Sequence, residues 1–551
     1  MKILIIPSAK TVSGELQQNF GEIPSVLIPL QGKPVFEHLF EQYRHTVDKI
    51  YIVGYEQSDL IEAYLVSRQL NHSVELVVLD RLGSLGYSIC FAMKEAFRSC
   101  GTVDSILVNF GDTLLNEEVQ ADENTVYYSK TRHSKTWTTF HHDSGKITQV
   151  WDRQEVQYAE NYDSFIGVFH FADPSAFLQA LEDAGKHNGV YDSFYHAVLT
   201  YNELYPYQIK QTQEWMDVGH QEQYIQTAKE VQARFFNTIE IDKQRGILTK
   251  KSENQEKFIK EIKWYLKLPS QLQYLIPRIF DYSLDYNDPY VRMEYYSYNT
   301  LHDLFVYGNH SLSQWDEIFD SMEQIILDMS RYQVSLGQEE AAASLDAIYI
   351  EKTIQRLNSL KHHPQLGRLL TEEIVINGKK FPPLSFYMEI LPELLQKNQV
   401  YNVNSFQIIH GDLCFSNILY SLSGSTIRLI DPRGEFGKFD IYGDIRYDLA
   451  KLSHSVLGRY DFIINDLIDV RMEDNRIRYE IHSNRRNAQI GERFRDRLSK
   501  LTDMRVIRLI ESLLFLSMVP LHGDYPRRQH VMLAVGVEML DSFLRGDGSD
   551  C

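Results

Sequence analysis

Short apolar runs and longer periodic segments alternate along the first part of the chain. The apolar runs, bounded by polar, Gly or Pro residues, predict buried strands at 2–7, 49–54, 74–79 and 105–110. Between them, apolar residues that recur every three or four positions predict amphipathic helices at 35–43, 58–70 and 86–98. This alternation predicts a doubly wound α/β sheet, which binds ligands at the carboxyl ends of its strands.

The pattern changes after residue 232. A hairpin is expected at 235–251, followed by a helix at 254–266 and a strand at 290–296. Beyond residue 300 the periodicity is mainly helical, with helices expected at 312–332, 341–360, 386–401 and 504–519. We therefore expect a first domain at 1–232, a small mixed lobe at 233–297 and a helical lobe at 298–551. A helix at 222–234, with no flexible tether, predicts that the first two parts pack together.

The segment 406–452 carries the densest group of candidate catalytic residues. Asp412 follows an expected strand in the sequence His-Gly-Asp, Asn417 lies five residues later, and Asp431 ends the next expected strand. Phosphoryl transfer needs a carboxylate that takes the proton of the attacking hydroxyl, and oxygen ligands that hold Mg²⁺. We predict Asp412 as the catalytic base, and Asn417 with Asp431 as Mg²⁺ ligands.

A lysine and a glutamate earlier in the chain fit the same chemistry. Lys250, with Lys251 as the alternative, ends the second strand of the expected hairpin, and Glu261 lies on the helix that follows. An ion pair of this kind orients a lysine toward nucleotide phosphates. The strand at 290–296 then leads into a hinge, where the backbone of Glu294 and Tyr295 would meet adenine.

These residues resemble the catalytic core of the aminoglycoside phosphotransferase and choline/ethanolamine kinase superfamily, which shares the protein-kinase-like fold. The resemblance implies a two-lobed α+β domain that binds ATP and Mg²⁺ in its cleft, with Asp412 as the base and Asn417 and Asp431 as metal ligands. Asp431 is followed by Pro-Arg-Gly, where protein kinases have Phe-Gly. This sequence is typical of the small-molecule branch of the superfamily and argues against a protein substrate.

The acceptor stays open between two classes of small molecule. A sugar or polyol would be held by hydrogen bonds, for which Arg433, Asp444 and Arg446 are available. A cationic amino alcohol would need aromatic and acidic walls, which the tyrosine-rich chain could supply. The segment 444–448 could instead have a purely structural role rather than contact the acceptor. The polar segment 520–529 is either a helix connector or a substrate contact.

Two carboxylates in the first domain suggest a second metal site. Asp112 follows the expected strand at 105–110, and Asp217 lies in the later sequence Glu-Trp-Met-Asp-Val-Gly. Together they could bind the Mg²⁺ of a nucleoside triphosphate. With the Gly-Lys-Pro turn at 32–34 and the glycines Gly83 and Gly86, they resemble the nucleotidyltransferases that make nucleotide sugars and CDP-alcohols. The resemblance implies Asp112 and Asp217 as metal ligands, the glycine segment as a contact to the base, and a second nucleoside triphosphate such as CTP or UTP.

The first domain departs from that family in its phosphate loop. The family has a Gly-rich loop with an Arg, and later a Pro-Lys pair whose lysine meets the phosphates; here the loop is 8–14, and Pro24 is followed by Ser25. Lys10 is the candidate substitute, because the leaving pyrophosphate needs a nearby positive charge rather than one particular position. The alternative is a domain that binds a nucleotide or sugar without chemistry.

Composition excludes some partners. The chain has 551 residues and a net charge of −19, which disfavours nucleic acid or an anionic membrane as the main partner. No apolar run reaches the length of a membrane span, and the opening run is too short for a signal peptide. The four cysteines show no Cys-x-x-Cys pair, which favours a reducing, cytoplasmic location. The oligomeric state is not indicated.

The two domains together predict a bifunctional enzyme. The second domain would phosphorylate a hydroxyl of a sugar, polyol or amino alcohol, and the first would join that phosphate to a nucleotide, for example in surface polysaccharide synthesis. One alternative is a kinase with a non-catalytic first domain. The presence of Asp412, Asn417 and Asp431 argues against a regulatory pseudoenzyme. The lack of a clear activation segment between Asp431 and Asp448 argues against a protein kinase.

Overall fold

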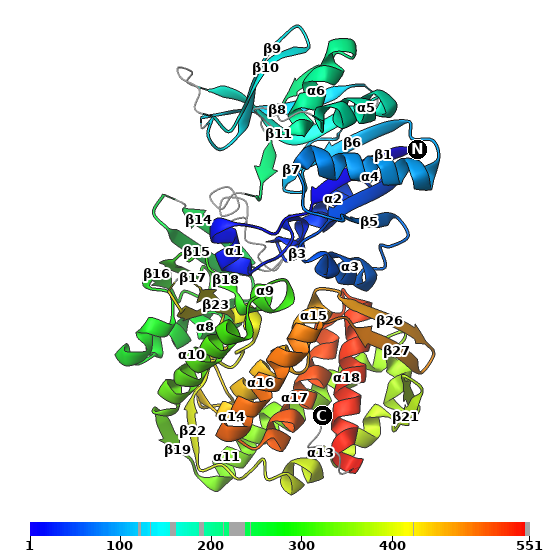
Figure 1. Ribbon diagram of the computed structural model, residues 1–551. Helices are drawn as coiled ribbons and strands as arrows, with labels where there is room; N and C mark the ends of the chain where they lie inside the picture. Colours follow the sequence, from blue (N-terminus) through cyan, green and yellow to red (C-terminus); the bar gives the residue numbers. More distant parts are fainter. Residues whose placement is uncertain are drawn as a thin grey trace. The chain divides into compact units, whose positions relative to one another are not determined.

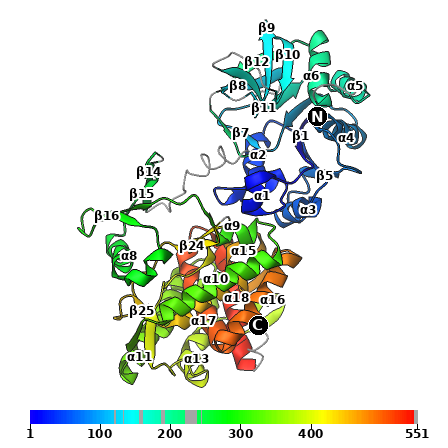
Figure 2. The same cartoon turned by 60° about the vertical axis from the view of Figure 1, so that its left-hand side comes forward.

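The computed structural model describes residues 1–119, 123–132, 134–154, 161–186, 192–212, 214–219, 237–242, 244–422 and 424–545. The chain divides into two compact units, 1–230 with 307–309 and 231–306 with 310–551 (Figures 1 and 2). The helix expected at 222–234 and the first residues of the expected hairpin lie outside the described residues.

Within its described residues, the amino-terminal unit is built on a nine-stranded sheet (Figure 1). Its parallel part runs in the order β5 (Val74–Val78), β4 (Lys49–Gly54), β1 (Lys2–Ser8) and β6 (Ser105–Asn109). The sheet continues through antiparallel β11 (Tyr162–Phe171) to β9 (Thr138–Asp143) and β10 (Lys146–Asp152), with β8 (Thr125–Thr131) and β12 (Gln208–Gln211) beside them. The α/β fold expected here is confirmed, and the apolar runs located its parallel strands to within one residue.

The winding direction of this sheet changes at β1. The chain continues from β1 to β4 on one side and later returns to β6 on the other. In open α/β sheets, ligands bind beyond the carboxyl ends of the strands at such a switch point. The loops that follow Ser8 and Asn109 therefore occupy the expected position of a binding site.

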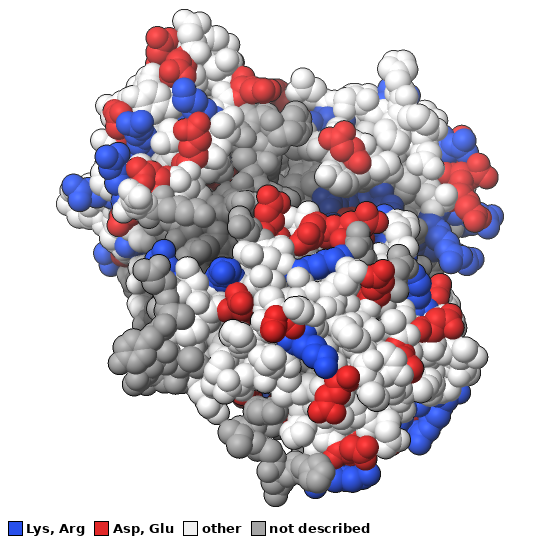
Figure 3. Space-filling model, turned by 90° about the horizontal axis from the view of Figure 1, so that it is seen from above, with Lys and Arg blue, Asp and Glu red and all other residues white. Residues whose placement is uncertain are grey.

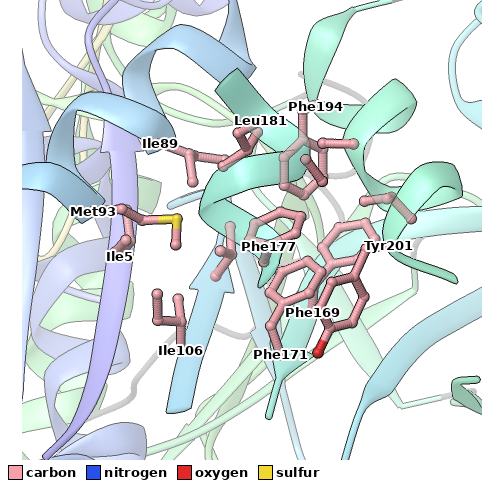
Figure 4. Packing of buried hydrophobic residues seen from close by; sticks show 14 of the residues in the cluster. Ile5, Ile89, Met93, Ile106, Phe169, Phe171, Phe177, Leu181, Phe194 and Tyr201 are labelled. Carbon is pink, nitrogen blue, oxygen red and sulfur yellow. The ribbon is translucent and has the colours of Figure 1, made fainter. Parts of the chain in front are cut away.

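One face of the sheet packs against α4 (Leu85–Cys100), α5 (Pro174–Ala184) and α6 (Ser193–Leu204) (Figure 4). Ile5 and Ile106 from the parallel strands meet Phe169 and Phe171 from β11 in this core. The alternate residues of β1, such as Leu4, are buried too, so the sheet is covered on both faces. The other α-helices among the described residues of this unit are α1 (Gly14–Phe20), α2 (Val35–Tyr43) and α3 (Ser58–Ser67).

The carboxy-terminal unit begins with a small antiparallel sheet in the order β14 (Asn237–Asp242), β15 (Ile247–Ser252), β17 (Tyr290–Glu294) and β16 (Ile279–Ser283). Helix α8 (Gln255–Lys267) follows β15, close to the bounds expected from its apolar periodicity. Three short strands then frame the segment 409–417, namely β22 (Ser405–Ile408), β23 (Ile418–Ser421) and β24 (Thr426–Leu429).

The rest of this unit is mainly helical (Figure 2). Its described helices are α9 (Leu301–Val306), α10 (Leu312–Ser330), α11 (Gln338–Leu345), α12 (Lys352–Asn358), α13 (Leu384–Lys397), α14 (Ile445–Val456), α15 (Tyr460–Ile464), α16 (Arg485–Leu501), α17 (Met504–Met518) and α18 (Pro526–Arg545). The helix expected at 341–360 is interrupted by a π-helical turn at Asp346–Glu351. Most of the segment 520–529 is a short connector, because α18 already begins at Pro526.

A four-stranded sheet of this unit was not expected from the sequence. It has the order β21 (Lys379–Phe381), β20 (Ile374–Ile376), β27 (Arg476–Ile481) and β26 (Ile468–Glu473). Among the described residues, no helix combines the length and apolar character needed to cross a membrane. Acidic and basic side chains are interspersed on the face that Figure 3 presents.

The aromatic core of the amino-terminal unit predicts a strong response to Phe177→Ala. Phe177 is fully buried and stacks on Phe171, with ring centres 3.5 Å apart. Removing this ring should lower the free energy of unfolding by about 3–5 kcal/mol, from lost burial and the cavity left behind. Urea unfolding followed by near-ultraviolet circular dichroism measures this change. Leu204→Ala is the control, because Leu204 is 78% exposed, and equal midpoints for the two variants would contradict the core described here.

Candidate functional site

Lys250 joins three elements of the carboxy-terminal unit. Its Nζ lies 2.8 Å from Glu261 Oε1 on α8 and 2.8 Å from Asp431 Oδ1, which follows β24. The Lys250 side chain is 5% exposed. Lys251 points the other way, because neighbouring residues of a strand face opposite sides, and its Nζ pairs with the exposed Asp288. Of the two lysines considered from the sequence, Lys250 is the one brought to Glu261 and Asp431.

The two carboxylates share one ammonium group. Burial alone would lower the pKa of Lys250, but Glu261 and Asp431 more than offset this and hold the pKa above its ordinary value. Burial raises the pKa of Glu261 to about 7, against the opposing effect of Lys250. The Asp431 side chain is 49% exposed, so one end of this network faces solvent, where a nucleotide or metal ion could reach it.

Asp412 lies in the loop after β22 and contacts two polar side chains. Lys451 Nζ, on α14, is 2.8 Å from Asp412 Oδ1. The Asn417 amide nitrogen donates to the Asp412 carbonyl oxygen at 2.8 Å and to its Oδ2 at 3.3 Å. The Asp412 side chain is 35% exposed, so a substrate can approach the carboxylate. No role was assigned to Lys451 from the sequence, although it lies one helical turn after Asp448 and so on the same face of α14.

The loop before Asp412 is held by a buried carboxylate. Asp448 accepts the backbone N–H groups of His410 at 2.6 Å and Gly411 at 2.8 Å. Burial raises the pKa of Asp448 to about 7, and these two hydrogen bonds act in the opposite direction. Gly411 has φ +78°, and a Cβ there would lie 2.8 Å from Arg433 Cβ. The backbone of this loop is therefore fixed by contacts from two other segments.

Asn417 and Asp431 lie at the facing ends of the paired strands β23 and β24. The Ile430 N–H donates to the Asn417 carbonyl oxygen at 3.0 Å, next to Asp431 in the chain. Because the Asn417 amide nitrogen binds Asp412, its amide oxygen is the atom that could bind a cation. One carboxylate and one amide oxygen suit Mg²⁺, which takes its other ligands from water and substrate phosphates. No group of three or more His, Cys, Asp or Glu side chains suited to a metal ion occurs among the described residues.

The backbone donors of the expected hinge are used within the small sheet. The Glu294 N–H donates to the Arg278 carbonyl oxygen, and the Tyr295 N–H to that of Gly246, each at 2.8 Å. These two N–H groups are therefore already paired with backbone carbonyl oxygens of the same unit. The Glu294 carboxylate instead accepts the Tyr296 hydroxyl at 2.7 Å and lines a pocket of about 400 Å³ that also includes Arg428.

Asp444 and Arg446 bind mainly to each other and to the interior of the unit. Asp444 is 3% exposed, caps α14, and accepts the Tyr349 hydroxyl at 2.9 Å. The Arg446 Nη2 lies 2.8 Å from Asp444 Oδ2 and 2.6 Å from the Val400 carbonyl oxygen. These contacts favour the structural alternative for this pair. Arg433, the third residue considered for acceptor binding, donates to the Tyr447 hydroxyl at 3.1 Å.

The two aspartates of the amino-terminal unit meet beside the switch point. The short strand β7 (Thr113–Leu115) pairs with β13 (Trp215–Asp217), so that Asp217 lies opposite Thr113. The Val218 N–H donates to the Asp112 carbonyl oxygen at 2.9 Å. The Asp112 carboxylate packs on Gly219, where a Cβ would be 2.5 Å from Oδ2. Two residues that are 105 positions apart in sequence thus share one edge of the sheet.

The loop after β1 lies at the same edge, because β1 and β6 are parallel neighbours. Lys10 is exposed on this loop. The next residue, Thr11, donates its N–H and its hydroxyl to Glu56 Oε2 at 3.0 and 3.2 Å. Ser25 occupies the position of the family lysine, and its Oγ is 3.1 Å from Ser8 Oγ. Ser25 therefore brings no positive charge. Lys10 is the basic residue of segment 8–14.

The glycines at the start of α4 are explained by packing. A Cβ on Gly86 would lie 2.4 Å from Ser193 Oγ, and one on Gly83 would lie 2.3 Å from the Tyr87 ring. The Leu85 and Gly86 N–H groups donate to the two carboxylate oxygens of Asp192, each at 3.0 Å. A side-chain carboxylate thus occupies the first amides of this helix, which are the groups that bind anions elsewhere.

No protein-family model matches the chain. The chain is 30% identical over 118 residues to the bifunctional protein GlmU of Methanococcus maripaludis strain C7, a match that spans 21% of this chain and 26% of that relative. It thus spans about a quarter of the length of the curated relatives it matches. Among solved structures, a nucleoside-diphosphate-sugar pyrophosphorylase from Vibrio cholerae is 15% identical, with 41% of this chain and 100% of that chain covered and a TM-score of 0.34. The inositol-1-phosphate CTP transferase from T. maritima is 14% identical, with 42% of this chain and 98% of that chain covered and a TM-score of 0.32. The amino-terminal region thus resembles sugar nucleotidyltransferases.

The role of Asp448 predicts that Asp448→Asn will loosen the loop before Asp412. An amide can accept only one of the two N–H groups, and its own NH₂ would face the other, at a cost of about 1–3 kcal/mol. Hydrogen exchange at the His410 and Gly411 amides should therefore accelerate. The control is Asp474→Asn, because the Asp474 side chain is 82% exposed. Unchanged protection in Asp448→Asn would show that other contacts fix the loop.

Proposed function

We propose that the protein is a bifunctional enzyme that phosphorylates a hydroxyl of a small metabolite with ATP and then joins the new phosphate to a nucleotide. The observation that carries the first activity is the placement of Lys250 between Glu261 and Asp431, in the same unit as Asp412 and Asn417. A buried lysine held by a helix carboxylate, with a metal-binding aspartate beside it, is what phosphoryl transfer to a hydroxyl requires.

Each residue of the carboxy-terminal site has a distinct task in this reaction. Asp412 takes the proton of the attacking hydroxyl, and Lys451 and Asn417 hold its carboxylate in one orientation. Lys250 pairs with the phosphates of ATP when these reach the exposed side of Asp431. Mg²⁺, when bound by Asn417 and Asp431 together with the phosphates, would neutralise charge on the transferred group.

The second proposed activity belongs to the amino-terminal unit. Its support is the sequence similarity to GlmU and the pairing of the strand that follows Asp112 with the strand that ends at Asp217, beside the switch point of the sheet. These carboxylates would hold Mg²⁺ on a nucleoside triphosphate such as CTP or UTP, and Lys10 would face the leaving pyrophosphate. The phosphomonoester made by the kinase is the kind of substrate that this reaction consumes, which suits synthesis of a surface polysaccharide precursor.

A second candidate function keeps the kinase and makes the amino-terminal unit a binding module. Ser25, which brings no cation, and Asp192, which occupies the first amides of α4, favour this alternative. Product analysis by mass spectrometry, with ATP, other nucleoside triphosphates and a panel of hydroxyl compounds, separates the two candidates. A nucleotide-linked product supports the bifunctional enzyme, and a phosphomonoester without pyrophosphate release supports the binding module.

Asp412→Asn should abolish most of the phosphoryl transfer. Loss of a general base reduces the rate by about 10²–10⁴-fold, whereas the affinity for ATP should change little because Lys250 and Asp431 remain. Phosphomonoester formation and ATP binding are measured side by side. Asp524→Asn, at an exposed position of the same unit, is the control. Full activity in Asp412→Asn would rule out the assigned base.

Asp112→Asn should remove the second activity selectively. Because a bound metal ion contributes several kcal/mol to such a reaction, pyrophosphate release should fall by about 100-fold or more. Phosphomonoester formation should continue, since Asp112 belongs to the other unit. Asp104→Asn, at the opposite end of the same strand and 67% exposed, is the matched control. Equal losses in both variants would point to damage to the sheet instead.

A further inference from the structure

Basic side chains from three elements converge beside Asp412. Lys352 and Arg356 lie on α12, Arg433 follows β24, and Lys451 lies on α14. Tyr447 is at their centre: Lys352 Nζ and the Arg433 guanidinium carbon are each 5.8 Å from the centre of its ring. Its hydroxyl accepts from Arg433 Nη1 at 3.1 Å. We refer to these basic residues and Tyr447 as the cationic cluster.

The positive charge of the cationic cluster is only partly balanced. Lys451 pairs with Asp412. In the part of the chain that the structure describes, no Asp or Glu oxygen lies within 4.0 Å of the charged nitrogens of Lys352, Arg356 or Arg433. Arg356 instead donates to the Ser517 carbonyl oxygen at 3.0 Å. This excess of cations stands out in a chain whose net charge is −19.

The titration behaviour of the cluster agrees with its geometry. Burial lowers the pKa of Lys352 to about 8, and the neighbouring cations Arg433, Arg356 and Lys451 act in the same direction. Burial alone would raise the pKa of Tyr447, but Lys352, Arg433 and Lys451 bring it down to about 8. The lowered pKa of Tyr447, in spite of its burial, indicates a region of positive potential that favours an added negative charge.

The backbone that carries Lys352 has a specialised form. The Lys352 N–H donates to the Ala347 carbonyl oxygen, five residues earlier, at the end of the π-helical turn. Such turns are rare and occur frequently at functional sites. Tyr349, within the same turn, donates to Asp444 at the start of α14. The turn therefore links the start of α12, which carries Lys352, to the start of α14, which carries Tyr447 and Lys451.

We propose that the acceptor of the kinase is an anionic hydroxyl compound, whose carboxylate or phosphate group is bound by Lys352, Arg356 and Arg433 while its hydroxyl reaches Asp412. This inference rests on the proposed function of the same unit. The acceptor oxygen forms a bond to the γ-phosphorus of ATP, the bond from that phosphorus to the β,γ-bridging oxygen breaks, Asp412 takes the hydroxyl proton, and ADP leaves. A cationic amino alcohol is disfavoured, because it would be repelled by the cluster.

A series of acceptors that differ in charge tests this inference on the full-length protein. Glycerol, glycerate, glycerol 3-phosphate and ethanolamine are each incubated with ATP and Mg²⁺, as are glucose, gluconate and glucose 1-phosphate. We expect kcat/KM to be at least about tenfold higher for an anion than for its neutral or cationic counterpart. Comparing kcat/KM for glycerate and gluconate with that for the two phosphate esters shows whether the site prefers a carboxylate or a phosphate group. Preference for a neutral or cationic acceptor overturns the inference and leaves the kinase standing.

Lys352→Met separates acceptor binding from nucleotide binding. KM for the anionic acceptor should rise about 10- to 100-fold, KM for ATP should stay within about twofold, and Lys352→Arg should restore part of the loss. Lys361→Met, at an exposed position nine residues later in the sequence, is the control. A rise in KM for ATP alone would assign the cluster to the nucleotide and overturn the inference.

A binding measurement keeps the inference testable if no acceptor is phosphorylated, an outcome that counts against the proposed function itself. Calorimetry then measures the affinities of glycerate and glycerol 3-phosphate in the wild type, Lys352→Met and Arg433→Gln. Binding that both variants weaken at least about tenfold supports the anion site. Absence of binding, or equal affinity in all three proteins, overturns it.

Discussion

The carboxy-terminal unit depends on one buried ammonium group. Lys250 is nearly inaccessible, and a charge in such a position is tolerated only when carboxylates compensate it. Glu261 and Asp431 do so from a helix and from a loop 181 residues away in sequence. Because both carboxylates contact the same buried ammonium group, the small sheet, α8 and the end of β24 must keep their relative positions. The interaction contributes geometry more than net stability, since the desolvation cost of buried ion pairs offsets much of their attraction.

That constraint extends to the Asp412 loop through a chain of shorter contacts. The Asp431 N–H donates to the Tyr265 hydroxyl at 3.0 Å, and the His410 Nε2 lies 2.9 Å from the Ile430 carbonyl oxygen, so the strand before Asp431 also positions the loop before Asp412. Burial lowers the pKa of His410 to about 4, which keeps the imidazole neutral and able to donate to this carbonyl. The proposed base and metal ligands are thus held by one continuous set of polar contacts.

The sequence predicted fully buried strands well and partly exposed strands poorly. The parallel strands were found because each is a continuous apolar run. Lys250 was preferred to Lys251, and the two side chains point to opposite faces of the strand. The β26–β27 hairpin was missed because half or more of its side chains are partly or fully exposed, which weakens the alternating pattern. The sequence also does not show that the N–H groups of Glu294 and Tyr295 are paired in the sheet, because their partners Arg278 and Gly246 lie on other segments.

The two proposed sites differ in electrostatic character, because one contains mainly carboxylates and the other mainly basic side chains. The amino-terminal site brings two aspartates together and has Lys10 on its loop, so it needs a cation to hold a triphosphate. The proposed carboxy-terminal site brings Lys352, Arg356 and Arg433 together with no carboxylate paired to them among the described residues, a charge that suits an anion. Lys352 and Arg356 are one helical turn apart, a spacing that an exposed helix face also shows. The contacts of Lys352 with Tyr447 and of Arg356 with Ser517 distinguish the two cases. Acceptor specificity at the proposed site would therefore depend on tertiary contacts, which a strand-and-loop motif such as His-Gly-Asp does not reveal.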